Sequence, residues 1–216
     1  MTLRERLDAL RSRRSAFPEL HEPYEAALAE LRRTDFLDHA LRAGDHFPDF
    51  MLPNAEGRLL SLQDLLAEGP LVLTFFRGEW CPYCQVVLDA LEEVQDSIAV
   101  QGATLVAVTP ESGGRALETK KRHNAHYEIL SDLDNGLGLQ CGVVFRLPDP
   151  YRRLLEQYDI DLGKRHGNDS WFLPVPATYV VDQDGVIQWA FLDLDFTKRA
   201  EPSTIVELLA GLKRRR

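Results

Sequence analysis

Hydrophobic residues recur at helical spacing through the first part of the chain. Two apolar series have this period, the first made of Leu3, Leu7 and Leu10 and the second of Tyr24, Leu28, Leu31, Leu37 and Leu41. Gly44 and Pro48 then interrupt the pattern. We therefore expect residues 1–43 to form an N-terminal extension of two helices, and residues 44–216 to form the main domain.

Short extended segments follow this break. Residues 50–52 and 58–60 flank the turn-rich run Pro-Asn-Ala-Glu-Gly, which predicts a small hairpin. Ser61 and Asp64 have the spacing of a helix N-cap and its third residue, and two leucines follow them. They predict a short helix directly after the hairpin.

The middle of the chain has the pattern of a parallel βαβ unit. Residues 71–76 are almost continuously apolar, as expected for a strand that is covered on both faces. From Pro82 to about Val100 the apolar residues form one stripe at helical period, and residues 103–108 return to a buried strand. A further helix is expected over about residues 112–124.

The C-terminal part predicts an antiparallel hairpin and a closing helix. Residues 178–182 and 186–192 indicate two strands joined by a Gln-Asp-Gly turn, and a helix follows Pro202. A βαβ unit followed by a hairpin and a helix predicts an α/β fold, in which helices flank a central mixed β-sheet.

Residues 142–175 fit this alternation of strands and helices poorly, and we interpret them as an insertion. It contains a predicted helix and then a polar stretch, at about residues 151–158 and 163–170. The alternative interpretation of the whole segment is a plain surface loop.

Composition and charge restrict the class of protein. The chain has 216 residues, with 25 Lys and Arg against 34 Asp and Glu, so its formal net charge is −9. This charge disfavours nucleic acid as a partner. The N-terminus lacks the apolar stretch of a secretory signal, and no apolar run approaches the roughly 20 residues that span a bilayer. We expect an ordered protein in the cytoplasm, with no membrane partner.

Two of the three cysteines stand where the central strand ends and the next helix begins. Pro82 is favoured as the first residue of a helix, which places Cys81 at the N-cap, where backbone amides and the helix dipole stabilise a thiolate. Cys84 lies one turn later on the apolar stripe. We therefore predict that Cys81 is the exposed, acidic, attacking thiol and that Cys84 is its shielded resolving partner.

Two other interpretations of this pair remain open. The cysteines could be small buried residues, or they could be half of a zinc site. Zinc requires two more ligands, and Cys141 is the only other cysteine, although six histidines leave this option available. The spacing and the βαβ context favour redox chemistry, with no metal, haem or flavin cofactor.

The segment Trp-Cys-Pro-Tyr-Cys at residues 80–84 resembles thioredoxins and glutaredoxins, whose superfamily also includes peroxiredoxins. The sequences around residues 44–62 and 177–187 resemble the alkyl hydroperoxide reductase/thiol-specific antioxidant family of peroxiredoxins. The resemblance covers about residues 44–141 and 174–212, and it implies a thioredoxin-like fold and an antioxidant activity.

The chain departs from the peroxiredoxin pattern at the site itself. On the family motif Pro-x-x-x-Thr-x-x-Cys, Cys84 takes the peroxidatic position, Cys81 replaces the threonine and Arg77 replaces the proline. The arginine that the family carries before its late strand falls at Pro176. Instead, Val175 and Pro176 resemble the cis-proline segment of thioredoxins. The peroxiredoxin alignment makes Cys84 the attacking sulfur, whereas the capping argument makes it Cys81, and we expect Cys81.

Several residues are candidates for the walls of the site: Arg77, Trp80, Pro82, Tyr83, His166, Trp171, Val175 and Pro176. Each also has a plainer interpretation. Trp80 could be a packing residue, an exposed loop arginine is the favoured interpretation of Arg77, and a bystander is the favoured interpretation of His166. Cys141 could be a further resolving thiol, but a small buried residue is the favoured interpretation.

Three functional hypotheses follow. The first is a thiol-dependent peroxidase of peroxiredoxin type, which reduces hydrogen peroxide or organic hydroperoxides and is recycled by an external thiol system such as thioredoxin or glutathione. The second is a thiol-disulfide oxidoreductase that acts on protein disulfides. The third is a redox-regulated interaction module. The helical extension could cap the sheet or form a homodimer surface.

Overall fold

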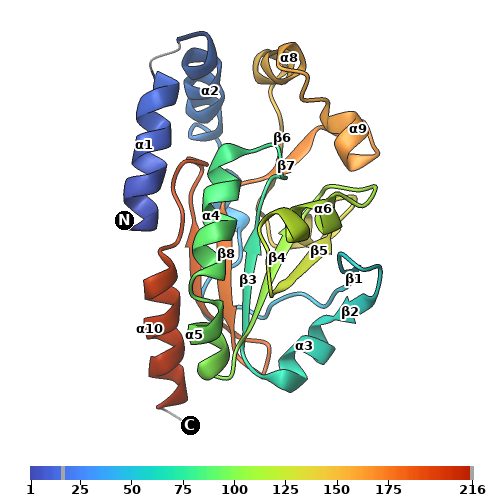
Figure 1. Ribbon diagram of the computed structural model, residues 1–216. Coiled ribbons are helices and arrows are strands. Elements are labelled where there is room, and N and C mark those ends of the chain that lie inside the picture. The colour runs from blue at the N-terminus through green and yellow to red at the C-terminus, as the bar shows by residue number, and fades with distance from the viewer. Residues whose placement is uncertain (16–17, 215–216) are drawn as a thin grey trace.

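A mixed five-stranded sheet in the order β5-β4-β3-β8-β9 forms the centre of the protein (Figure 1). The structure is a computed structural model, and it describes residues 1–15 and 18–214. Its strands are β3 (Leu71–Phe75), β4 (Thr104–Thr109), β5 (Glu128–Ser131), β8 (Ala177–Val181) and β9 (Ile187–Leu192). The first three are parallel, β8 is antiparallel to β3, and β9 is antiparallel to β8. The predicted α/β fold with a mixed central sheet is confirmed.

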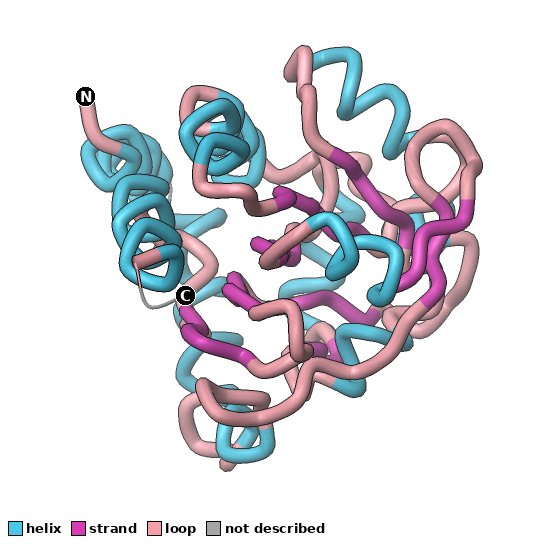
Figure 2. The backbone as a smooth tube through the Cα atoms, turned by 90° about the horizontal axis from the view of Figure 1, so that it is seen from below, coloured by secondary structure: helices cyan, strands magenta, loops and turns pink. Residues whose placement is uncertain are grey.

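Strand β3 is buried along its whole length, as its apolar sequence predicts. Because successive side chains of a strand point to opposite faces, Leu71, Leu73 and Phe75 join one hydrophobic cluster, while Val72 joins the other. The sheet therefore has a core on each face, and Figure 2 shows helices on both sides of the strands.

Helices cover both faces of the sheet. The Val72 face packs against α4 (Pro82–Glu92), α5 (Gln95–Val100), α6 (Arg115–Arg122) and α10 (Pro202–Lys213). The opposite face packs against α3 (Leu62–Glu68) and α7 (Gly136–Gln140). The structure places α6 and α10 where the sequence predicts helices. Strand β5 and helix α7 are elements that the sequence analysis does not predict.

The apolar stripe from Pro82 to about Val100 spans two helices, α4 and α5, instead of one continuous helix. Val94, at φ −114° and ψ 2°, leaves the helical region between them. The apolar stripe nevertheless continues across the break, since Val94 and the fully buried Ile98 pack against the same core. A single helical period in the sequence is therefore compatible with two helices that share one face.

The N-terminal extension contains α1 (Leu3–Ser15) and α2 (Pro18–Leu31). The second helix is shorter than predicted, because α2 ends at Leu31 while the apolar series continues to Leu41. The Leu31 carbonyl accepts a hydrogen bond from the Thr34 hydroxyl at 2.7 Å. A 3₁₀ helix, η1 (Phe36–His39), follows. Leu37 and Leu41 pack against the core on the other face of the sheet, which explains why they continue the apolar series.

The predicted hairpin and short helix are confirmed. The hairpin consists of β1 (Met51–Pro53) and β2 (Leu59–Ser61), which pair antiparallel. Ser61 caps α3, and the reciprocal hydrogen bonds between Ser61 and Asp64 form a complete capping box.

Residues 142–175 form two short strands and two helices whose apolar residues join the two main cores. Strands β6 (Val144–Arg146) and β7 (Phe172–Pro174) pair antiparallel, and α8 (Asp149–Gln157) and α9 (Leu162–His166) lie between them. The predicted helix in this segment is present, but the polar stretch begins with α9 and is not simply a loop. Helix α8 packs against α2, with the rings of Tyr24 and Tyr151 6.2 Å apart.

Within residues 1–15 and 18–214, no helix combines the length and the apolar composition needed to cross a membrane.

Candidate redox site

Cys81 is the N-cap residue of α4, and Pro82 is its first helical residue, as predicted. Cys84 lies one turn later, and its backbone N–H donates to the Cys81 carbonyl at 2.9 Å. Both thiols are free. Cys81 forms part of the wall of a cavity of about 400 Å³, whereas Cys84 is absent from that wall. The two sulfurs therefore differ in their access to a small molecule.

The prediction that Cys81 is exposed is wrong, because only 1% of its surface is accessible. Leu10 of α1, Tyr151 of α8 and Phe196, which follows β9, all contribute to the cavity around it. These residues lie far from Cys81 in the sequence. The local pattern that places Cys81 at a helix N-terminus therefore could not reveal its burial.

The surroundings shift the pKa values of the two thiols in opposite directions. Burial by itself raises the pKa of Cys81, but a hydrogen bond from Cys84 and the charges of Arg77 and Arg199 together bring that pKa below its ordinary value. Burial raises the pKa of Cys84, and the neighbouring Cys81 raises it further. The geometry thus supports Cys81 as the thiolate of the pair and Cys84 as the thiol that donates to it.

Arg77 belongs to the site and is not an exposed loop arginine. Its side chain is buried, and its guanidinium carbon lies 4.0 Å from the centre of the Phe196 ring and 4.7 Å from that of Trp80. Burial alone lowers the pKa of Arg77, but the nearby Cys81, Tyr151 and Cys84 raise it above its ordinary value. Arg77 therefore remains a cation beside Cys81.

Arg199 is a second cation at the pair and was not predicted from the sequence. Its Nη2 lies 3.7 Å from the Cys84 sulfur, and its Nη1 donates to the carbonyls of Phe196 and Lys198. Arg199 is separated from Cys84 by 115 residues. No local motif marks it, since a lone arginine before a helix has no distinguishing sequence signal.

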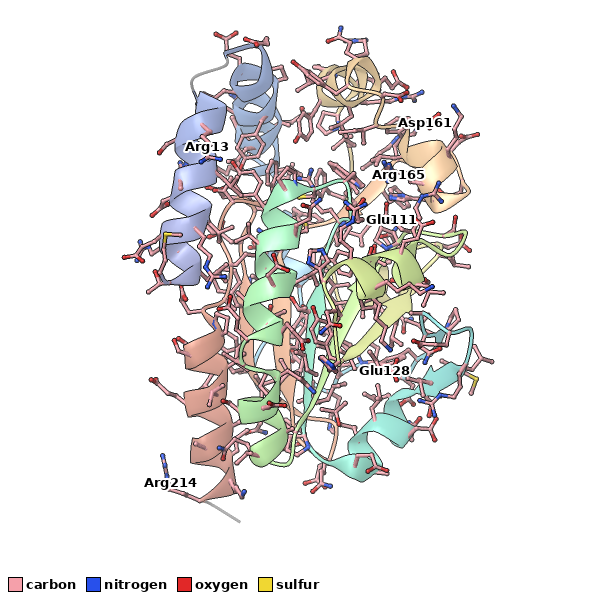
Figure 3. The ribbon with its side chains drawn as sticks, in the orientation of Figure 1. Arg13, Glu111, Glu128, Asp161, Arg165 and Arg214 are labelled. Atoms are coloured by element: carbon pink, nitrogen blue, oxygen red, sulfur yellow. The ribbon has the colours of Figure 1, made fainter. Side chains whose placement is uncertain are left out.

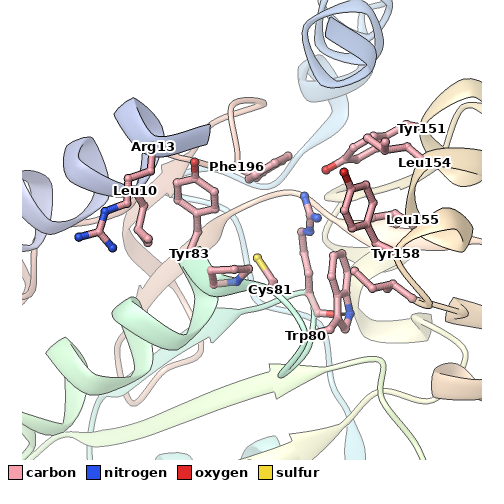
Figure 4. Close-up of a pocket in the computed structure, with 13 residues that line it drawn as sticks. Leu10, Arg13, Trp80, Cys81, Tyr83, Tyr151, Leu154, Leu155, Tyr158 and Phe196 are labelled. Carbon is pink, nitrogen blue, oxygen red and sulfur yellow. Dashed lines mark hydrogen bonds between the residues drawn. The ribbon is translucent and has the colours of Figure 1, made fainter. Parts of the chain in front are cut away.

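The cavity is mostly aromatic and aliphatic. The residues that line it are Leu10, Arg13, Arg77, Trp80, Cys81, Pro82, Tyr83, Tyr151, Leu154, Leu155, Tyr158, Ile160 and Phe196. Figure 4 shows Cys81 between Tyr83 on one side and Trp80 on the other. Four of the predicted wall residues, namely Arg77, Trp80, Pro82 and Tyr83, are therefore in this cavity. Its other walls come from α1, α8 and the segment after β9.

The other four predicted wall residues lie outside the cavity. Val175 and Pro176 precede β8, beside the end of β3, because Ala177 pairs with Phe75. No cis peptide bond occurs in the described part of the chain, so Pro176 does not have the cis geometry suggested by its resemblance to thioredoxins. His166 and Trp171 are both buried.

His166 and Trp171 have surroundings of their own. Burial, aided by Arg165 and Arg115, lowers the pKa of His166 to about 4, so its imidazole is neutral near pH 7. The Arg152 guanidinium lies 4.2 Å from the centre of the Trp171 ring. Neither residue is placed to act as a wall of the cavity at Cys81.

A buried carboxylate supports the loop that precedes Cys81. Glu111 accepts the backbone N–H of Glu79 at 2.8 Å and pairs with Arg165 at 3.1 Å. Figure 3 shows Glu111 and Arg165 close together at this end of the sheet. No local sequence signal marks Glu111, because its partners lie 32 and 54 residues away.

Cys141 is fully buried in the hydrophobic cluster on the opposite face of the sheet from Cys84. Burial raises the pKa of its thiol well above the ordinary value. Its position agrees with the interpretation as a small buried residue. Within the described ranges, no three His, Cys, Asp or Glu side chains gather where they could hold a metal ion.

Two close cysteines at the start of the helix after β3, in a mixed sheet flanked by helices, define a thioredoxin-like fold with a dithiol site. The model of the AhpC/TSA family matches residues 43–190. The chain therefore belongs to the AhpC/TSA family, which agrees with the resemblance seen in the sequence.

Individual relatives are distant. The chain is 23% identical over 158 residues to a bcp-type peroxiredoxin of Coxiella burnetii, covering 72% of this chain and 93% of the relative. It is 22% identical over 149 residues to the thiol-disulfide oxidoreductase ResA of Bacillus subtilis, covering 68% of this chain and 66% of that protein. The structure of peroxidoxin BcpB from Mycobacterium tuberculosis has a TM-score of 0.63 at 20% identity, covering 80% of this chain and 98% of that one.

Proposed function

We propose that this protein is a thiol peroxidase that reduces hydroperoxides through a cycle between Cys81 and Cys84. One observation carries the proposal: Cys81 opens on a cavity beside a buried guanidinium, while Cys84 lies behind it in the core. In the proposed cycle, the ionised sulfur is therefore the one that a small oxidant can reach. The sulfur that completes the disulfide is protected from solvent.

The reaction has two chemical steps before recycling. The Cys81 thiolate attacks the outer oxygen of the O–O bond, which breaks to give a sulfenic acid on Cys81 and an alkoxide that takes a proton to become an alcohol. The Cys84 sulfur then attacks the sulfenic sulfur, and water leaves as the disulfide forms. An external thiol system, such as thioredoxin or glutathione, would supply two electrons to restore both thiols.

Arg77 is suited to assist the first step. Its buried Nε has no hydrogen-bond partner among the residues that the structure describes. A donor of this kind can bind the oxygen on which negative charge develops as the O–O bond breaks. Arg77 would therefore both favour the Cys81 thiolate and stabilise the departing alkoxide.

The cavity favours an organic hydroperoxide over hydrogen peroxide. Its volume of about 400 Å³ far exceeds what hydrogen peroxide would fill, because one water takes up only about 30 Å³ in the liquid. Leucines and aromatic rings surround this space, and the charged residues in its wall are both arginines. The ligand that best fits is thus an apolar hydroperoxide that is neutral or anionic.

Mass spectrometry after treatment with less than one equivalent of cumene hydroperoxide or hydrogen peroxide tests the proposal. We expect the wild type to form the Cys81–Cys84 disulfide, Cys84→Ser to accumulate a sulfenic acid on Cys81, and Cys81→Ser to accumulate none. Sulfenic acid on Cys84 in the Cys81→Ser variant would reverse the assignment of the attacking sulfur. If neither variant is oxidised, the peroxidase proposal is wrong.

The second candidate is a thiol-disulfide oxidoreductase that acts on protein disulfides. The N-cap position of Cys81, its lowered pKa and the protonated Cys84 favour it, because the same pair could exchange with a disulfide. The burial of Cys81, of which 1% is exposed, argues for a substrate small enough to enter the cavity and against the surface of a folded protein. Brisk reduction of insulin disulfides together with slow reaction with every hydroperoxide would favour this second function.

A further inference from the structure

We propose that Arg199 is a catalytic residue of the recycling step, in which it stabilises the Cys84 sulfur as the leaving group when the Cys81–Cys84 disulfide is reduced. The inference rests on the dithiol cycle proposed above. The reduction step is common to both candidate functions, so it does not require the oxidant to be a peroxide.

The charges of both arginines act on both thiols, but Arg199 is the one in direct contact with the Cys84 sulfur. The Arg199 guanidinium contacts the Cys84 sulfur at 3.7 Å, whereas the Arg77 guanidinium lies in the wall of the cavity with Cys81. Arg199 is held in place by the carbonyls of Phe196 and Lys198, which accept from its other terminal nitrogen. It can therefore keep its position while Cys84 changes its bonding partner.

The accessible sulfur determines which bond breaks. An external thiolate that enters the cavity meets Cys81, because Cys84 has no exposed surface. Its attack on the Cys81 sulfur forms a mixed disulfide and breaks the Cys81–Cys84 bond, and the electron pair of that bond leaves on Cys84 as a thiolate. A second external thiol then attacks the mixed disulfide, releasing Cys81 and the oxidised reductant.

Cys84 is a poor leaving group without a nearby cation. A thiolate in an apolar core lacks the solvation that water would provide, and thiol–disulfide exchange is slower when the leaving thiol is less acidic. The guanidinium at 3.7 Å supplies a fixed positive charge at the atom where negative charge appears. Arg199 lies outside residues 43–190, the segment that matches the family model.

Rapid-reaction kinetics can test this role without any peroxide. The disulfide is prepared with diamide, and its reduction by dithiothreitol is followed through tryptophan fluorescence in wild type, Arg199→Gln, Arg199→Lys and Lys198→Gln. Losing a cation of this kind shifts a pKa by about one to three units, so we expect Arg199→Gln to slow reduction roughly 3- to 30-fold. Arg199→Lys should recover most of the rate because it keeps the charge.

Lys198→Gln is the matched control. Lys198 is exposed and pairs with Asp193 at 3.3 Å, so its loss should leave the reduction rate unchanged. If Arg199→Gln fails to fold, Arg199→Met can replace it, because the apolar side chain of Met needs no polar partner. We expect Arg199→Met to slow reduction to the same extent. Alkylation of reduced Cys81 at alkaline pH, where the thiolate forms in every variant, should keep the wild-type rate and thereby show an intact cavity.

Reduction of Arg199→Gln at the wild-type rate, or of Arg199→Lys as slowly as Arg199→Gln, would overturn the inference. Failure of the proposed function has a different signature, since a protein whose disulfide forms with diamide but not with any hydroperoxide can still show the Arg199 effect.

Discussion

The Arg77 guanidinium carbon lies 4.0 Å from the centre of the Phe196 ring, which joins the loop before α4 to the segment after β9. Tyr83 also contacts this ring, with the two centres 5.4 Å apart. Phe196 thereby holds Arg77 from one side and forms a wall of the cavity at Cys81. The electrostatics of the thiolate and the shape of the cavity depend on the same contact.

Replacing Arg77 with Gln should raise the pKa of Cys81. The charge of Arg77 lowers this pKa, and an opposite charge at such range shifts a pKa by about one to three units. In a Cys84→Ser background, where the serine hydroxyl can still donate to Cys81, alkylation should stay near its maximum rate until the pH falls well below the ordinary thiol range. Adding Arg77→Gln should move that fall to higher pH.

The direction of this shift in the pH profile follows from the lowered pKa of Cys81. A lowered pKa keeps Cys81 ionised at neutral pH, and the thiolate is lost as the pH falls through the lowered value. The variant with both Cys81→Ser and Cys84→Ser provides the background rate. Identical pH profiles with and without Arg77 would show that this arginine does not act on the thiolate.

Helix α1 should influence the choice of peroxide through Leu10. Leu10 is partly buried and lines the cavity, so Leu10→Gln replaces an apolar contact by a polar one without adding charge. We expect the ratio of kcat/KM for cumene hydroperoxide to that for hydrogen peroxide to fall roughly threefold to tenfold, since each buried methylene contributes about 0.8 kcal/mol. Leu139→Gln, at an exposed position outside the cavity, should leave the ratio unaltered.

Tyr24→Phe should destabilise the segment that carries Phe196. The Tyr24 hydroxyl donates to Asp195 at 2.5 Å, and Asp195 also accepts from the backbone and the hydroxyl of Thr197. Loss of a hydrogen bond to a charged group should lower the free energy of unfolding by about 1.5–3 kcal/mol, measured by urea denaturation. Tyr158→Phe, at an exposed position, should cost less than about 0.5 kcal/mol.

The effect of Tyr24→Phe should also depend on pH. Burial raises the pKa of Asp195, but the hydrogen bonds from Thr197 and Tyr24 bring it below its ordinary value. Their stabilisation is fully present above the pKa of Asp195 in the unfolded chain and is lost as the pH falls through the lower folded value. A difference between wild type and variant that stayed constant into strong acid would contradict an ionised acceptor.

Gly78→Ala should weaken the loop before Cys81. Gly78 has φ +137°, and a methyl group there would lie 2.6 Å from Nε1 of Trp80 and 2.7 Å from Cδ of Glu111. Backbone strain and overpacking together should reduce the free energy of unfolding by about 2–4 kcal/mol. Gly57→Ala is the control, because Gly57 has φ +85° but open space around it, so it should show the backbone strain alone.

The amino-acid sequence by itself determined the local features of this protein. The βαβ unit, the capping box at Ser61 and the N-cap position of Cys81 were predictable, because each depends on residues within a few turns or on the period of one element. The thioredoxin-like fold followed from the order of these elements and from the resemblance of their sequences to a known family.

Only the tertiary structure decided the surroundings of the two sulfurs. The burial of Cys81, the inward position of Arg77 and the contact between Arg199 and Cys84 all depend on packing between distant segments. The helical period marks the buried face of α1 and α8 without saying what that face covers. The acidity of each thiol depends on charges and burial around it in space, so it could be assigned only once those segments were in place.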